Sequence, residues 1–138
     1  MDIKLMRQKI DNILDHNPFS KVIGLELLEI DEGYAKGRIK FAPNFKNVHG
    51  GLHGGCSYAL GDTLSGVASS TFGNYTTTIN GSINYLKAIR DTEYVYGESR
   101  VVRQGGTIGV YNVNITNDAG EVLATGTYTY YRTSTPIE

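Results

Sequence analysis

The chain of 138 residues carries 13 Lys and Arg against 14 Asp and Glu, and its net charge of -1 offers no broad basic surface to nucleic acid or to an anionic membrane. This length suits a single domain over residues 1–138 with a sizeable hydrophobic core. One cysteine, a charged N-terminus without a signal-peptide core and no apolar run of membrane-spanning length lead us to expect a cytoplasmic protein without an internal disulfide.

The first predicted element is an amphipathic helix over residues 2–15. Apolar side chains recur there at helical spacing with charges between them, namely Ile3, Met6, Ile10, Ile13 and Leu14. Asn17-Pro18 ends the helix, because a proline disfavours helical geometry in the residue before it. We therefore assign residues 1–18 to an N-terminal helix and its connection.

Two strands and a second helix are predicted next. Residues 24–30 and 34–41 have strand-like patterns and flank a turn at residues 31–33. A helix over residues 54–72 then carries an apolar stripe made of Cys56, Leu60, Leu64, Val67 and Ala68. Its opposite face holds small residues and one acid, namely Gly55, Ala59, Asp62, Gly66 and Ser69.

Four strand-like segments complete the chain, over residues 75–89, 92–104, 107–117 and 121–132. A long helix followed by antiparallel strands predicts an α+β fold, with one curved antiparallel sheet wrapped around one central helix. Leu60, Leu64 and Val67 should face this sheet. Because a single sheet on one helix leaves an edge strand and a broad face open, we expect the chain to dimerise.

The segment from Asn47 to Thr63 concentrates the candidate chemistry. Residues 47–55 are a glycine-rich loop that lets a ligand approach the backbone, and they lead into a helix start with unpaired N–H groups. Gly54 is the candidate backbone donor to an oxyanion, and Asn47 can donate from its amide or position a water. Asp62, the only acid in the segment, is the candidate general base or nucleophile, and the sequence leaves both roles open.

The order Asn47, His53-Gly54-Gly55 and Asp62-Thr63, followed by these strands, resembles the PaaI-like (phenylacetyl-CoA-type) family of hotdog-fold thioesterases over about residues 20–132. The resemblance implies a hotdog fold that hydrolyses acyl- or aryl-CoA thioesters without metal or cofactor. It implies homodimers, or homotetramers that are dimers of dimers. It also implies that the hydroxyl of Thr78 helps to hold the attacking water.

Helix geometry limits what one chain can assemble. If the helix begins near Gly54, Asp62 lies about 12 Å further along its axis, at about 1.5 Å per residue. A carboxylate reaches only a few ångströms, so we expect the Asp62 of one chain to meet the Gly54 of another across a two-fold axis. The prediction is a composite site at the dimer interface, two per dimer.

Further substrate contacts are predicted from the strand after the helix and from nearby cations. Alternation places Thr78, Asn80, Ser82 and Asn84 on one polar face, so Asn80 and Ser82 are candidate substrate contacts. Lys87 and Arg103 are the candidate cations for the phosphates of CoA. The family often has a basic residue in the hairpin after Arg103, where this chain has Gly105-Gly106-Thr107.

The remaining reactive residues have simpler interpretations. His53 should orient the loop, and Gly55 and Thr63 should support the site as the other motif residues. His49 and His53 are four residues apart but lie in a loop, without further ligands at metal-site spacing, so we predict no metal. Cys56 lies on the apolar stripe and is predicted to be a small core residue.

Three alternative functions stay open at this point. A hotdog hydratase or dehydratase would pair a histidine with an acid, although the usual histidine placement is missing. A non-catalytic domain could bind or sense acyl-CoA, and a degenerate scaffold would do neither. The release of free thiol from CoA esters separates these alternatives.

Overall fold

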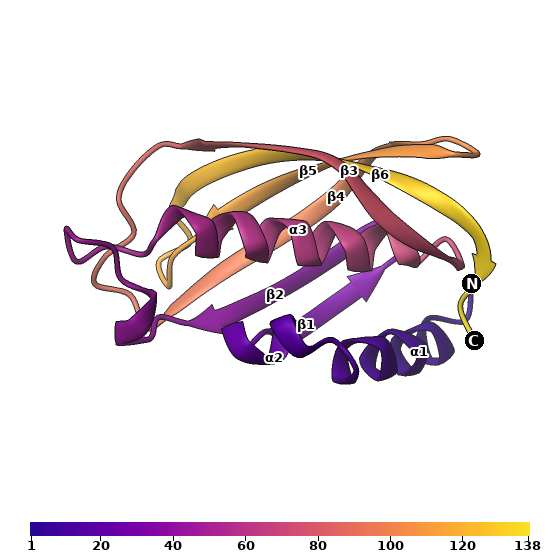
Figure 1. The fold of residues 1–138 in the computed structure, drawn as a ribbon, viewed down its shortest axis with the longest axis horizontal. Coiled ribbons are helices and arrows are strands. Elements are labelled where there is room, and N and C mark those ends of the chain that lie inside the picture. The colour runs from indigo at the N-terminus through magenta and orange to yellow at the C-terminus, as the bar shows by residue number, and fades with distance from the viewer.

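The computed structural model describes residues 1–138 as one six-stranded sheet and three α-helices. The elements are α1 (Ile3–Asp15), α2 (Pro18–Ile23), β1 (Glu26–Asp31), β2 (Tyr34–Lys40), the 3-10 helix η1 (Pro43–Phe45), α3 (Gly54–Ser70), β3 (Asn74–Tyr85), β4 (Tyr94–Gln104), β5 (Ile108–Thr116) and β6 (Val122–Pro136). Every pairing is antiparallel, in the order β1-β2-β4-β5-β6-β3. The sheet curves around α3, and α1 and α2 lie beside β1 and β2 (Figure 1). No helix has the length and apolar content that crossing a membrane would need.

Helix α3 is held by its apolar stripe, as predicted. Leu60, Leu64, Val67 and Ala68 are all buried in the main core cluster, and Cys56 is partly buried against it. Glycines in the sheet let the helix approach closely, since a Cβ at Gly37 would lie 2.9 Å from the tip of Leu64. The α+β prediction of a curved antiparallel sheet around one long helix is therefore confirmed.

A second short helix, α2, was not predicted. Asn17-Pro18 ends α1, but it also begins α2, because Asn17 Oδ1 accepts a hydrogen bond from Ser20 N at 3.3 Å and Pro18 occupies the first helical turn. Gly24 closes α2 in the left-handed region, with φ of 71°. The first strand consequently starts at Glu26, two residues later than predicted.

Strand β3 departs from simple alternation at a β-bulge. The pairing with β6 shifts register between Thr78 and Asn80. Thr78 points to α3, where it donates a hydrogen bond to Asp62. Gly81 also faces α3, because a Cβ there would meet the hydroxyl of Tyr58. The prediction that Thr78 shares a face with Asn80 and Ser82 is therefore wrong, since these two exposed residues lie on the opposite face of the strand.

The close packing around Gly37 predicts that adding a side chain there lowers the stability of the fold. In the variant Gly37→Ala, the new Cβ would lie 2.9 Å from the backbone oxygen of Glu26, which the β1–β2 ladder holds in place. We expect a loss of about 1–3 kcal/mol in the free energy of unfolding, measured by urea denaturation. The control Gly106→Ala has open space around its Cβ and should stay within about 0.5 kcal/mol of the wild type. Equal stabilities for the two variants would contradict this packing.

Candidate active site

The loop before α3 is tied into one conformation by Asn47. Its Oδ1 accepts hydrogen bonds from His49 N at 2.9 Å and Gly51 N at 3.2 Å, and its backbone N–H donates to Gly51 O at 2.8 Å. Arg90 Nη1 fixes the same loop by donating to His49 O at 2.8 Å. The side-chain oxygen of Asn47 is thus used within the loop, and its Nδ2 donors bond no other group of the protein.

The first turn of α3 presents one free backbone donor. His53 caps the helix, with Nδ1 accepting from Gly55 N at 2.9 Å, which requires that Nδ1 carries no proton. The N–H of Gly54 has no acceptor within the chain, as expected at a helix start. Tyr85 donates to Gly54 O at 2.6 Å, and its ring would lie 2.8 Å from a Cβ at Gly54, so a side chain at this position would displace Tyr85.

These groups open into one cavity of about 400 Å³ at the helix start. Its walls are Asn47, Leu52, Gly54, Ser57, Tyr85, Leu86, Lys87, Ala88 and Ile89. Lys87 is largely exposed there and pairs with Glu121 at 3.1 Å. We call this space the helix-start cavity; it brings the predicted donors Asn47 and Gly54 together with one predicted cation.

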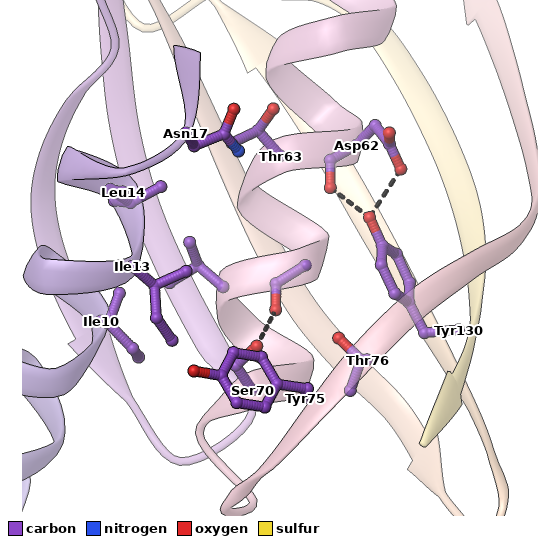
Figure 2. A pocket seen from close by; sticks show the side chains of 12 residues that line it. Ile10, Ile13, Leu14, Asn17, Asp62, Thr63, Ser70, Tyr75, Thr76 and Tyr130 are labelled. Carbon is purple, nitrogen blue, oxygen red and sulfur yellow. Dashed lines mark hydrogen bonds between the residues drawn. The ribbon is translucent and has the colours of Figure 1, made fainter. Parts of the chain in front are cut away.

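Asp62 lies on a different part of α3, and both of its side-chain hydrogen bonds go to the same oxygen. Asp62 Oδ1 accepts from Tyr130 Oη at 2.6 Å and from Thr78 Oγ1 at 2.8 Å. The Tyr130 hydroxyl also contacts the backbone oxygen of Asp62 (Figure 2). Oδ2 of Asp62 accepts no hydrogen bond from the chain, which leaves it free for a substrate or a water.

Tyr130 is a residue that sequence reasoning missed. Its side chain is only 4 % exposed. Burial, and then the neighbouring Asp62 carboxylate, raise the pKa of Tyr130, so the hydroxyl stays protonated and donates to Asp62. Tyr128 and Tyr130 are two residues apart on the last strand, so they lie on the same face of it. This spacing was the only sign in the sequence of a shared role. The sequence did not show which strand face met Asp62.

Asp62 opens into a groove of about 220 Å³ between α1 and α3. Its apolar lining comes largely from α1, and its polar lining comes mainly from α3, β3 and β6. The lining residues are Ile10, Ile13, Leu14, Asn17, Asp62, Thr63, Gly66, Val67, Ser70, Tyr75, Thr76 and Tyr130. Figure 2 shows the α1 side chains on one side of this groove and the Asp62–Tyr130 pair on the other. We call it the α1 groove. Asp62 is its only charged lining residue.

The chain therefore holds two partial sites that share no lining residue. Asn47, Gly54 and Lys87 line the helix-start cavity, whereas Asp62 and Thr63 line the α1 groove. Two predicted substrate contacts, Asn80 and Ser82, lie on the strand face opposite Asp62, because of the bulge. The other predicted cation, Arg103, is exposed near the end of β4 and lines neither cavity.

Cys56 and the histidines show no reactive arrangement. Burial raises the pKa of the Cys56 thiol, which disfavours the nucleophilic thiolate. No group of three or more His, Cys, Asp or Glu side chains is arranged to hold a metal ion. Among the predicted site residues, the backbone N–H of Gly54, Nδ2 of Asn47 and Oδ2 of Asp62 are polar groups without a hydrogen-bond partner in the chain.

Comparison with known proteins identifies the family. The family profile described as "Thioesterase superfamily" matches residues 49–124, which include the end of the glycine-rich loop, α3 and the strands β3, β4 and β5. The chain belongs to the thioesterase superfamily. The solved Escherichia coli PaaI protein superposes with a TM-score of 0.91 at 22 % identity, covering 96 % of each chain, which shows a shared fold. The predicted PaaI-like hotdog fold is confirmed.

Three further comparisons, one with a solved structure and two with sequences, extend this relationship. A hypothetical thioesterase from Streptococcus pneumoniae, solved with coenzyme A, is 30 % identical with a TM-score of 0.77, over 82 % of this chain and 88 % of that one. Human acyl-coenzyme A thioesterase 13 is 27 % identical over 128 residues, which are 90 % of this chain and 91 % of the relative. The E. coli acyl-coenzyme A thioesterase PaaI is 24 % identical over 117 residues, 85 % of this chain and 84 % of the relative.

Proposed function

We propose that this member of the thioesterase superfamily hydrolyses acyl- or aryl-CoA thioesters to a free acid and CoA, at a composite site formed by two copies of the chain. The observation that carries the proposal is that Gly54 N–H and Asp62 Oδ2 are both free of intrachain partners, in separate cavities. The names of the E. coli and human relatives, and the coenzyme A in the S. pneumoniae structure, support this substrate class.

The free edge of the sheet supports the pairing of two copies. β3 is an edge strand of 12 residues with Ile79 and Tyr85 more than half exposed. Along this strand, Thr78 lies next to Asp62 of α3, to which it donates a hydrogen bond, and Tyr85 lies next to Gly54, to which it also donates. Two β3 strands paired antiparallel about an axis near Gly81 would set Thr78 of one copy against Tyr85 of the other. Asp62 would then lie beside the Gly54 of its partner.

The proposed chemistry divides the reaction between these groups. Gly54 N–H, with the Nδ2 donor of Asn47, would hold the thioester carbonyl oxygen and stabilise the negative charge that develops on it. Asp62 Oδ2 would take a proton from a water that attacks the carbonyl carbon, or attack that carbon itself. The C–S bond then breaks, and the CoA thiolate leaves and takes up a proton. If Asp62 is the nucleophile, the acyl group stays on its carboxylate as an anhydride, and a water then hydrolyses that anhydride to release the free acid. Thr78 would keep Asp62 and the water in place.

The two cavities would take different parts of the substrate. The α1 groove contains no lysine or arginine, and its α1 wall is apolar, which suits an acyl or aryl group. The helix-start cavity contains Lys87, which suits the phosphate-bearing CoA portion. The thioester bond would lie where the two meet, between Asp62 of one copy and Gly54 of the other. We expect a homodimer with two such sites, or a dimer of dimers, as the family resemblance implies.

The first test concerns the carboxylate. Asp62→Asn keeps the shape of the side chain and removes its charge, so thiol release from the best ester in a panel of aryl-, short-, medium- and long-chain acyl-CoAs should fall by about 10²–10⁴-fold. Asp11→Asn, which changes an exposed carboxylate on α1, is the control and should keep full turnover. Sedimentation should give the same assembly for both variants. Unchanged turnover in Asp62→Asn would reject the role of Asp62, and binding without thiol release by the wild type would favour the sensing alternative.

The second test concerns the α1 groove. Ile13→Trp adds bulk to a lining residue, so kcat/KM should fall by about 10-fold or more for the largest acyl group accepted by the wild type, and less for acetyl-CoA. The control Phe19→Trp changes a residue that is 57 % exposed and lies outside the groove, so its substrate profile should match the wild type. An unchanged profile in Ile13→Trp would place the acyl group elsewhere.

A further inference from the structure

The carboxylate of Asp62 is held asymmetrically. Tyr130 Oη and Thr78 Oγ1 both donate to Oδ1, at 2.6 Å and 2.8 Å, and Oδ2 receives no donor from the chain. The terminal torsion of an aspartate is broad, so an unrestrained carboxylate exchanges its two oxygens easily. Two charge-assisted hydrogen bonds to one oxygen remove that freedom.

We propose that Tyr130 is a positioning residue that fixes the Asp62 carboxylate, with Oδ2 as the oxygen that reacts. This inference rests on the proposed function, because it concerns the reacting group of that site. Tyr130 does not touch the substrate in this proposal. It acts through Asp62, by keeping Oδ1 occupied by hydrogen bonds from β6 and β3 while Oδ2 stays without a partner in the chain.

The ring of Tyr130 is itself immobilised. It packs edge-on against Tyr111, with ring centroids 6.3 Å apart and planes at 86°. The hydroxyl lies directly above Gly66 of α3, where a Cβ would be 3.4 Å from Tyr130 Oη, which is van der Waals contact. A buried ring wedged between β5 and α3 cannot swing away, so its hydroxyl is a fixed donor.

Tyr128 provides an internal comparison two residues earlier on β6. Its side chain is fully buried, and its hydroxyl donates to the backbone oxygen of Tyr58 at 3.0 Å, one helical turn before Asp62. Both tyrosines therefore attach β6 to a backbone oxygen of α3. Only Tyr130 also contacts a carboxylate. A comparison of the two tyrosines therefore distinguishes the role of holding the helix from the role of positioning the carboxylate.

The experiment compares Tyr130→Phe with Tyr128→Phe in the full chain. Each variant loses one hydroxyl that holds α3, so both should lower the thermal midpoint to a similar extent. Only Tyr130→Phe should lower kcat, by about 10- to 100-fold, with KM for the acyl-CoA within about two-fold of the wild type. Equal kcat values in the two variants, or a rise in KM with kcat unchanged, would overturn the inference.

Thr78 tests whether the two donors act as one unit. Thr78→Val should lower kcat and Thr78→Ser should restore it, because serine keeps the hydroxyl. The double variant Tyr130→Phe/Thr78→Val should lose less than the product of the two single losses, since both act on the same oxygen. Multiplicative losses would show that the two hydroxyls have unrelated roles.

A crystal structure of Tyr130→Phe tests the positioning directly, whether or not the protein turns over any ester. We expect the Asp62 carboxylate to rotate or to occupy two orientations in the variant. A carboxylate that keeps its wild-type orientation would overturn the inference on its own. Failure of the proposed function is a distinct result, namely a wild-type protein that releases no thiol from any ester while its Asp62 still depends on Tyr130.

Discussion

The docking of α3 inside the curved sheet determines the rest of this molecule. Leu60 and Leu64 are fully buried against the sheet, so the helix is a rigid spacer between the groups on its surface. Gly54 and Asp62 are eight residues apart on that spacer, which separates them by about 12 Å along the axis. Each therefore lines a cavity of its own. On our proposal, the rigidity that stabilises the fold is also what makes a second copy necessary for the chemistry.

The same contacts that pack the helix also prepare the candidate site. Tyr128 and Tyr130 bring β6 against α3, and the absence of a side chain at Gly61 leaves room for the Tyr128 hydroxyl. The hydroxyl of Tyr130 contacts the helix backbone and also donates a hydrogen bond to the Asp62 carboxylate. At the other end of the helix, Tyr85 covers Gly54 in a similar way from the edge strand. Tyrosines of the sheet thus contact the helix at both partial sites.

The sequence pattern predicted correctly those features that depend on residues close together in the chain. It failed for features that depend on pairing between strands far apart in the chain. The apolar stripe containing Leu60 and Leu64, and the loop that leads into α3, follow from spacing and glycine content alone. The bulge after Thr78 arises from pairing with β6, about 50 residues away, so no local alternation could show it. For the same reason, the sequence placed Asn80 beside Thr78 and gave no sign that Tyr130 meets Asp62.

The composite site is the central claim, and a mixed dimer tests it most directly. Asp62→Asn lacks the carboxylate, and Asn47→Asp lacks the Nδ2 donor while keeping the oxygen that ties its loop. The two chains, co-expressed with different tags and purified in tandem, would form dimers with one intact site and one doubly altered site. We predict that these mixed dimers regain thiol release, up to about half the wild-type turnover, although each parent homodimer is nearly inactive. Mixed dimers as inactive as both parents would contradict the shared site.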